Sequence, residues 1–372
     1  MSEFQYYEFQ AIDRPLTPEE QQAVARLSSR VDPHPRRAVF TYSWSDFPAR
    51  SEEVLTRYYD AMLYMANWGR TQLMFRFPQA LVDLGQMEQY NVQTHDYPSD
   101  VLTVSSVGEY VILSIRADAE AGDGWIESEG CLDGLIGLRE AILHGDYRLL
   151  YLAWLMGLAL EYDVDEGALE PPVPPGLNRL TPSLQNFVEL FGVDEDLIEV
   201  AAEGSGEAAV VSEDELRRAI AALPSEEKDA FLLRLAQGEP LLSLAFKRRL
   251  DVWHDASQGD RARRTVGQLL AAAEALVERE RQGQAAKAEA RRIAEMEALA
   301  QREAQTWEEI EALIQRSQAK PYDQATRLLV QLKELAAYQG READFEARLG
   351  EVVARYQRRR ALLERFRRAG LI

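Results

Sequence analysis

The negative charge of this chain is concentrated in its middle, and this limits how the chain can fold. Residues 117–216 contain 23 acidic residues against three basic ones, Arg139, Arg148 and Arg179, so this segment accounts for the whole formal net charge of −20. Ionised carboxylates are rarely buried without a partner, so the segment is expected to present an anionic surface. Such a surface repels nucleic acids and membranes and favours a basic protein partner.

Length and composition predict a cytoplasmic protein with two or three folded domains. The chain has 372 residues, of which 46% are hydrophobic and 9% aromatic, which favours true cores over a disordered acidic tail. The most apolar run, residues 149–160, has 12 residues and is predicted to be a buried helix, because a membrane span needs about 20. Cys131 is the single cysteine, so no internal disulfide is expected and a reducing compartment is favoured.

Hydrophobic periodicity predicts an α+β fold. Four segments of the first 116 residues alternate apolar and polar side chains, as strands do; they are centred on Phe9, Tyr42, Phe75 and Leu113. One helix is expected from a capping box at Thr17 and Glu20, and a second from Ser51 to Ala66. The N-terminal part is therefore predicted to be an α/β layer, a β-α-β-α-β unit with further strands.

The rest of the sequence predicts helices, with an extended proline-rich connector at Glu170–Gly176. We expect four parts: an α/β domain over residues 1–116, an acidic and mainly helical extension packed on it over 117–205, a helical hairpin over 210–258, and a long helix with a C-terminal helical bundle over 259–372.

A heptad seam lies in the predicted long helix. Apolar residues recur at alternating spacings of three and four between Ile293 and Ile314, with Trp307 among them. The seam predicts either a homodimeric coiled coil or a helix that packs within the chain. Between Glu278 and Arg292 large apolar side chains are almost absent, so that part is expected to be solvated or to bridge two packed regions.

No catalytic, cofactor-binding or strong metal-binding motif occurs in the sequence. Glycine-rich phosphate loops, H-E-x-x-H and paired C-x-x-C motifs are missing, so we expect no cofactor and favour a non-catalytic protein. Asp163, Asp165 and Glu166 resemble the opening of a calcium loop, but Pro174 stands at the twelfth position, where that loop requires glutamate. A solvated acidic turn is therefore favoured over a metal site.

The residues expected to contact a partner come from the acidic segment, the seam and the C-terminus. Seven arginines against one acid lie between Arg355 and Arg368, a patch large enough for weak, salt-sensitive phosphate binding. We favour the interpretation that these arginines pair with the acidic segment or are exposed to solvent. The predicted interaction residues are Trp125, Asp163, Asp165, Glu166, Glu170, Asp194, Glu195, Trp307, Arg358, Arg359 and Arg360.

Four segments resemble an uncharacterised family of bacterial proteins: YYEFQAIDRPLT, ANWG, LEPPVPPGL and DLIEVAAE. The resemblance covers roughly residues 5–240 and implies no activity and no site residue. The C-terminal YQRRRALLERFRRAGL is similar to the helical end of larger bacterial proteins with SWIM-type zinc fingers, whose zinc-binding residues this chain lacks. A further similarity is to accessory proteins of bacterial CRISPR-associated defence loci.

The sequence predicts a non-catalytic adaptor or regulatory protein that binds a basic protein partner through an acidic surface. Three alternatives stay open. They are an accessory protein of a CRISPR-associated defence system, a metal-dependent hydrolase built from scattered acids of Asp118–Glu170, and a homo-oligomeric coiled-coil scaffold. Membrane binding is not expected, and nucleic acid only weakly through Arg355–Arg368.

Overall fold

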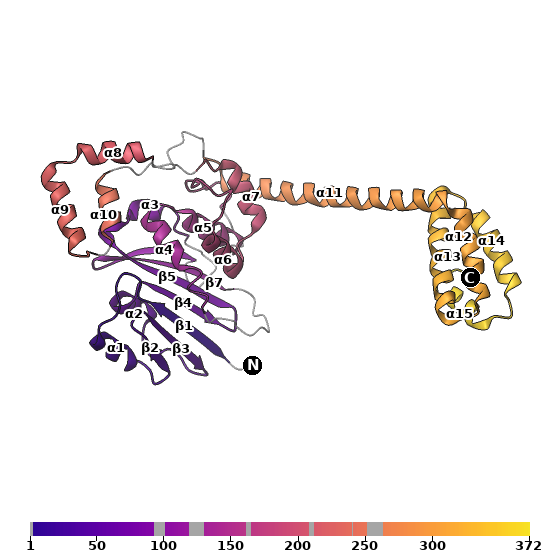
Figure 1. The fold of residues 1–372 in the computed structure, drawn as a ribbon, viewed down its shortest axis with the longest axis horizontal. Helices are drawn as coiled ribbons and strands as arrows, with labels where there is room; N and C mark the ends of the chain where they lie inside the picture. The colour runs from indigo at the N-terminus through magenta and orange to yellow at the C-terminus, as the bar shows by residue number, and fades with distance from the viewer. Residues whose placement is uncertain are drawn as a thin grey trace. The chain divides into compact units, whose positions relative to one another are not determined.

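The chain has an α+β fold, as predicted, and divides into two compact units, Met1–Leu276 and Val277–Ile372 (Figure 1). The N-terminal unit contains a sheet covered by helices, and the C-terminal unit is helical. The computed structural model describes residues 3–92, 101–118, 130–160, 165–207, 212–239, 241–250 and 263–372.

An antiparallel seven-stranded sheet forms the frame of the N-terminal unit, in the order β2-β3-β1-β4-β5-β7-β6. The register places Tyr7 of β1 opposite Phe40 of β3 and Tyr64 of β4. The strands are β1 (Phe4–Gln10), β2 (Val31–Pro33), β3 (Arg37–Ser43), β4 (Ala61–Ala66), β5 (Arg70–Pro78), β6 (Leu102–Val107) and β7 (Tyr110–Asp118).

Helices cover both faces of this sheet, because alternate residues of its central strands are apolar on both sides. One face packs against α1 (Pro18–Ala25) and α2 (Ser51–Tyr58), through residues such as Phe9 and Met62. The other face packs against a larger layer. That layer consists of η1 (Gln79–Leu81), α3 (Leu84–Glu88), α4 (Ile136–Leu143), α5 (Arg148–Leu160), α6 (Pro182–Phe191) and α7 (Glu195–Gly204).

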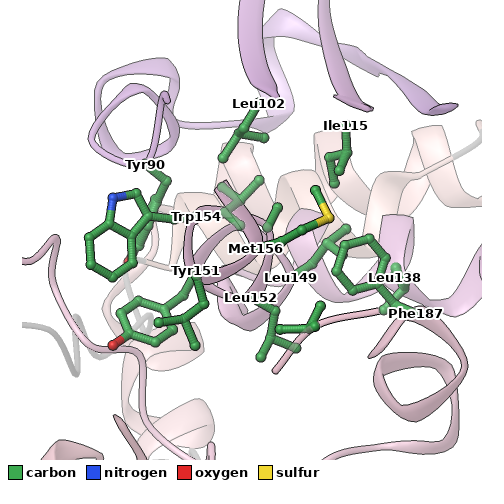
Figure 2. Packing of buried hydrophobic residues seen from close by; sticks show 14 of the residues in the cluster. Tyr90, Leu102, Ile115, Leu138, Leu149, Tyr151, Leu152, Trp154, Met156 and Phe187 are labelled. Carbon is green, nitrogen blue, oxygen red and sulfur yellow. The ribbon is translucent and has the colours of Figure 1, made fainter. Parts of the chain in front are cut away.

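The apolar run at residues 149–160 is the centre of the larger layer. It lies within α5, and residues 149–158 are all buried, which confirms the predicted buried helix. Figure 2 shows Leu149, Leu152 and Met156 of this helix packed below Leu102 of β6 and Ile115 of β7. Burial from all sides explains why the run has no polar face.

The second predicted helix is shorter than expected and is followed by an unpredicted strand. The helix ends at Tyr58, and β4 begins at Ala61. Because both faces of β4 are covered, Met62 and Leu63 are both fully buried, and such a continuous apolar run has no period-2 signal. Trp44 continues the alternation of Phe40 and Tyr42 in the sequence, but it lies just after β3 with φ of 67° and is 66% exposed, so it does not belong to the buried strand.

A buried charge network joins the larger helical layer to the sheet. Asp60, 1% exposed, accepts hydrogen bonds from the backbone N–H of Ile12 (2.7 Å) and Asp13 (3.0 Å) and from the Arg76 guanidinium (2.6 Å). Arg139 of α4, 2% exposed, donates two bonds of 2.8 Å to the Asp13 carboxylate and one of 2.9 Å to the Arg76 carbonyl. Every charge in this interior region therefore has a partner.

Asp60→Asn is expected to lower the free energy of unfolding by about 3 kcal/mol, because it leaves the buried Arg76 guanidinium without its carboxylate partner. Burial favours the neutral acid, but Arg139 and Arg76 outweigh it and hold the pKa of Asp60 below its ordinary 3.8. The stabilisation is therefore complete above that pH and is lost as the pH falls through the folded-state pKa. Urea unfolding at several pH values measures both effects. Glu109→Gln is the control; it lies on an exposed turn and should change stability little. Equal losses of stability in both variants would contradict the assignment of the loss to the buried charge network.

Two short helices follow the larger layer in the segment where a helical hairpin is predicted, and we refer to this pair as the hairpin. It consists of α8 (Glu213–Ala222) and α9 (Ser225–Ala236), and α8 begins with the predicted capping box of Ser212 and Glu215. The next helix, α10 (Leu242–Arg249), buries Leu242 and Leu244.

The long helix α11 (Val266–Gln301) begins in the N-terminal unit and ends in the C-terminal one. Each residue from 277 to 292 is exposed, so the predicted solvation of this part is confirmed. The C-terminal unit has its own core, formed by α12 (Glu303–Gln315), α13 (Ala319–Gln339), α14 (Glu342–Arg355) and α15 (Arg360–Arg368). Across the described ranges, no helix combines the length and apolarity that crossing a membrane requires.

Candidate interaction surfaces

Several acids of the central segment are used inside the structure. Glu170, 2% exposed, accepts hydrogen bonds from the Tyr151 hydroxyl and from the Arg264 guanidinium, the latter with Nη2 2.9 Å from Oε1. Burial and the Glu170 carboxylate raise the pKa of Tyr151, which keeps its hydroxyl a donor. Glu170 is therefore engaged inside the structure and not on its surface, where the predicted contact with a partner would need it.

The acidic turn predicted at Asp163–Glu166 helps to position the start of α11. The Asp165 carboxylate accepts a hydrogen bond of 2.9 Å from the Gly167 N–H, and the Glu166 carbonyl accepts one of 3.0 Å from Gly267. Asp163, like Trp125, lies outside the described residues. Among the residues that are described, no group of three or more His, Cys, Asp or Glu side chains is placed to hold a metal ion.

Another carboxylate lies deeper in the sheet and was not singled out in the sequence. Glu8 of β1 is fully buried; it accepts hydrogen bonds from the Tyr6 hydroxyl (2.9 Å) and the Gln10 amide (3.0 Å) and pairs with Arg37 of β3 (2.8 Å). Gln10 also donates to Asp133, at 2.6 Å. These contacts join β1 to β3 and to the residues before α4, so we assign Glu8 a structural role.

Five exposed carboxylates of the acidic segment lie on α6 and α7 or at the start of α7. Asp194 caps α7 by accepting hydrogen bonds from the N–H groups of Asp196 (2.9 Å) and Leu197 (3.3 Å). Glu195, Glu199 and Glu203 follow at spacings of four, which places them along one side of the helix. We call the exposed residues Glu189, Asp194, Glu195, Glu199 and Glu203 the acidic strip; the described part of the chain provides no ion pair for any of them.

An exposed apolar surface lies on the hairpin that follows. Leu232, Leu233 and Leu235 of α9 are 63%, 61% and 64% exposed, and we call these three residues the leucine ridge. No side chain of α8 or α9 is buried. α9 packs against α10 through Phe231, whose ring lies 4.9 Å from the ring of Phe246.

Sequence reasoning predicted helices in this segment but missed the leucine ridge. The signal is present in the run FLLRLA, which places large apolar side chains around more of α9 than one neighbouring helix can cover. Only the structure shows that Phe231 takes the side facing α10 and that the three leucines face solvent.

Trp307 is not an exposed interaction residue. Its side chain is 3% exposed, packs in the core of the C-terminal unit near Phe345 (ring centroids 5.9 Å apart), and lies under the Arg348 guanidinium at 4.5 Å. It also lines a cavity of about 180 Å³ between α12, α13 and α14. Trp307, Ile310 and Ile314, the second half of the heptad seam, are therefore buried within this chain.

The predicted arginines at the C-terminus have different surroundings. Arg358 and Arg360 are exposed, whereas Arg359 is half-buried and its guanidinium donates to the Ile314 carbonyl. Other arginines of the patch pair with acids of the same unit, for example Arg355 with Glu311 at 2.7 Å.

Comparison of the chain with protein-family models, with curated proteins and with solved structures finds no match. The exposed features that bear on function are the acidic strip, the leucine ridge and the C-terminal arginines.

Trp307→Ala is expected to destabilise the C-terminal unit by about 3 to 5 kcal/mol, because it removes a large buried side chain. Hydrogen exchange of residues 303–368 measures this loss, and light scattering measures the molar mass. Tyr338→Ala, at a residue 45% exposed, should change neither. A Trp307→Ala protein of unchanged stability and lower molar mass would instead place the seam between two chains.

Proposed function

We propose that this chain is a non-catalytic adaptor or regulatory protein whose N-terminal unit binds a basic protein partner at the leucine ridge. The exposure of Leu232, Leu233 and Leu235 is the observation that carries the proposal. Single exposed leucines are common on protein surfaces, but Leu232 and Leu235 are three residues apart and are therefore neighbours on one side of α9, with Leu233 exposed on the adjacent side. Exposed apolar surface of this kind marks a protein interface.

The hairpin lacks the burial that helices of its length need. Helices of 10 and 12 residues are marginally stable in water unless an apolar face is packed. Local contacts support the hairpin, including the capping box of α8 and the Glu227–Arg249 ion pair at 2.8 Å. Covering the ridge would add roughly 1.5 to 3 kcal/mol for each leucine that passes from full exposure to full burial. A helix that lays its own apolar side along α9 fits this requirement.

The charge around the ridge favours a basic partner. Glu226, Asp229 and Leu233 follow one another at spacings of three and four, so the two acids lie on the side of α9 that carries Leu233, toward the start of the helix. Both acids are exposed, and no ion pair within the described residues engages them. Residues 1–276 carry a net charge of −23, which would speed encounter with a cationic partner, while the leucines would hold it. The expected partner is an amphipathic helix with Lys or Arg beside its apolar face.

A designed Lys–Leu amphipathic peptide tests this function with the full chain. Fluorescence anisotropy of the labelled peptide should show binding that weakens as salt is raised, because the charges are exposed. Leu232→Glu with Leu235→Glu should weaken binding at least tenfold, since it places charge in the apolar contact. Val277→Glu with Tyr338→Glu is the matched control, because it adds the same charge at apolar residues of 46% and 45% exposure.

Three outcomes would contradict the proposal. Equal weakening in both double variants would mean that net charge alone attracts the peptide. The second outcome is that binding is lost in the triple variant Glu195→Gln, Glu199→Gln and Glu203→Gln but is kept when the leucines are substituted. The peptide would then contact the acidic strip. A wild-type dimer that the leucine substitutions convert to a monomer would make the ridge a contact between two copies.

A further inference from the structure

Two turns meet at one end of the C-terminal bundle. The Arg359 guanidinium, from the α14–α15 turn, donates to the Ile314 carbonyl and to the Tyr322 hydroxyl (3.2 Å), on either side of the α12–α13 turn. Figure 1 shows α15 at the end of the bundle away from α11. The basic residues that flank these contacts in the sequence are thereby brought to one surface.

That surface carries uncompensated positive charge. We call Arg316, Lys320, Arg358 and Arg360 the basic cap; all four are exposed, and within the described chain no side-chain hydrogen bond or ion pair engages them. The neighbouring acids already have partners, since Glu311 pairs with Arg355, Asp323 with Arg365 and Glu364 with Arg368. The cap therefore presents four positive charges to solvent.

Helix stability does not account for this arrangement. Arg316 follows α12, where a positive charge is favourable, but Lys320 and Arg360 lie in the first turns of α13 and α15, where the helix dipole makes positive charge unfavourable. Arg358 adds a further like charge two residues before Arg360. Three of the four charges thus lower local stability, which favours a role in recognition.

The composition of the cap favours a polyanion over a protein partner. Ile314, Tyr322 and Leu362, beside the two turns, are buried, and Tyr356 is half-buried with the Arg359 guanidinium over its ring. Protein interfaces, in contrast, centre on exposed apolar or aromatic anchors. The C-terminal unit has 19 basic and 16 acidic residues, a net charge of +3. No exposed aromatic ring lies in the two turns for bases to stack on, as single-strand binding requires.

We infer that the basic cap binds the phosphate backbone of duplex nucleic acid without reading its sequence. A duplex offers the high charge density that a small cluster of guanidinium groups can use, and arginine matches phosphate geometry in pairs of hydrogen bonds. Such binding is weak and strongly salt-dependent. It is independent of the leucine ridge, which lies in the other unit.

Anisotropy of a labelled random-sequence DNA duplex, titrated with the full chain from low to physiological salt, tests the inference. The slope of log affinity against log salt should correspond to about four phosphate contacts, near −0.9 for each. Arg358→Glu with Arg360→Glu should weaken binding at least tenfold and reduce the slope by about two. Arg281→Glu with Lys287→Glu is the matched control, because it makes the same charge change at exposed residues of α11.

The controls separate the cap from net charge and from an acidic protein partner. Unchanged circular dichroism and melting of both variants would show that the substitutions leave the fold intact. Undetectable duplex binding at low salt, or equal weakening by both variants, would overturn the inference. If a polyglutamate peptide binds more tightly than the duplex, and only the cap variant loses that binding, the partner of the cap is an acidic protein.

Discussion

The N-terminal unit depends on the burial of the Arg139 guanidinium between the Asp13 carboxylate and the Arg76 carbonyl. Arg139 lies on α4, the first helix after the sheet, and the chain from α4 to α10 continues from that anchor. Buried ion pairs add little stability compared with apolar residues of the same volume, but breaking one is costly. The network therefore favours one position of the larger helical layer against the sheet over other positions.

Acidic residues serve three different purposes in this protein. Asp60 and Glu170 are buried partners of arginines and fix internal geometry. Asp194 and Glu215 cap helices, where a carboxylate also interacts favourably with the helix dipole. The acidic strip remains exposed, so its charge acts at a distance on approaching molecules. Net charge alone therefore overstates the carboxylate surface that a partner can reach.

Strands that keep polar residues at alternate positions, and helices with local capping signals, were predictable. The strands at Phe9, Phe75 and Leu113 alternate because polar residues such as Glu8, Arg76 and Ser114 stand between their apolar ones, and the helices that start after Thr17 and Ser212 have capping boxes. The segment that forms β4 was predicted as helix. Helices pack on both faces of β4, so its consecutive residues are apolar and its sequence does not alternate. Trp307 was read as a coiled-coil residue because a heptad pattern does not tell whether its partner helix belongs to the same chain.

The sequence by itself determined the charge segregation, the absence of familiar catalytic motifs, the helix caps and the exposed stretch of α11. Each of these depends on residues that are close together in the chain. Tertiary structure decided which carboxylates are paired, which leucines of α9 face solvent, and that the turns around Arg316 and Arg358 meet. Burial and pairing are contacts between residues far apart in the sequence, such as Arg359 with Ile314, and local periodicity carries no information about them.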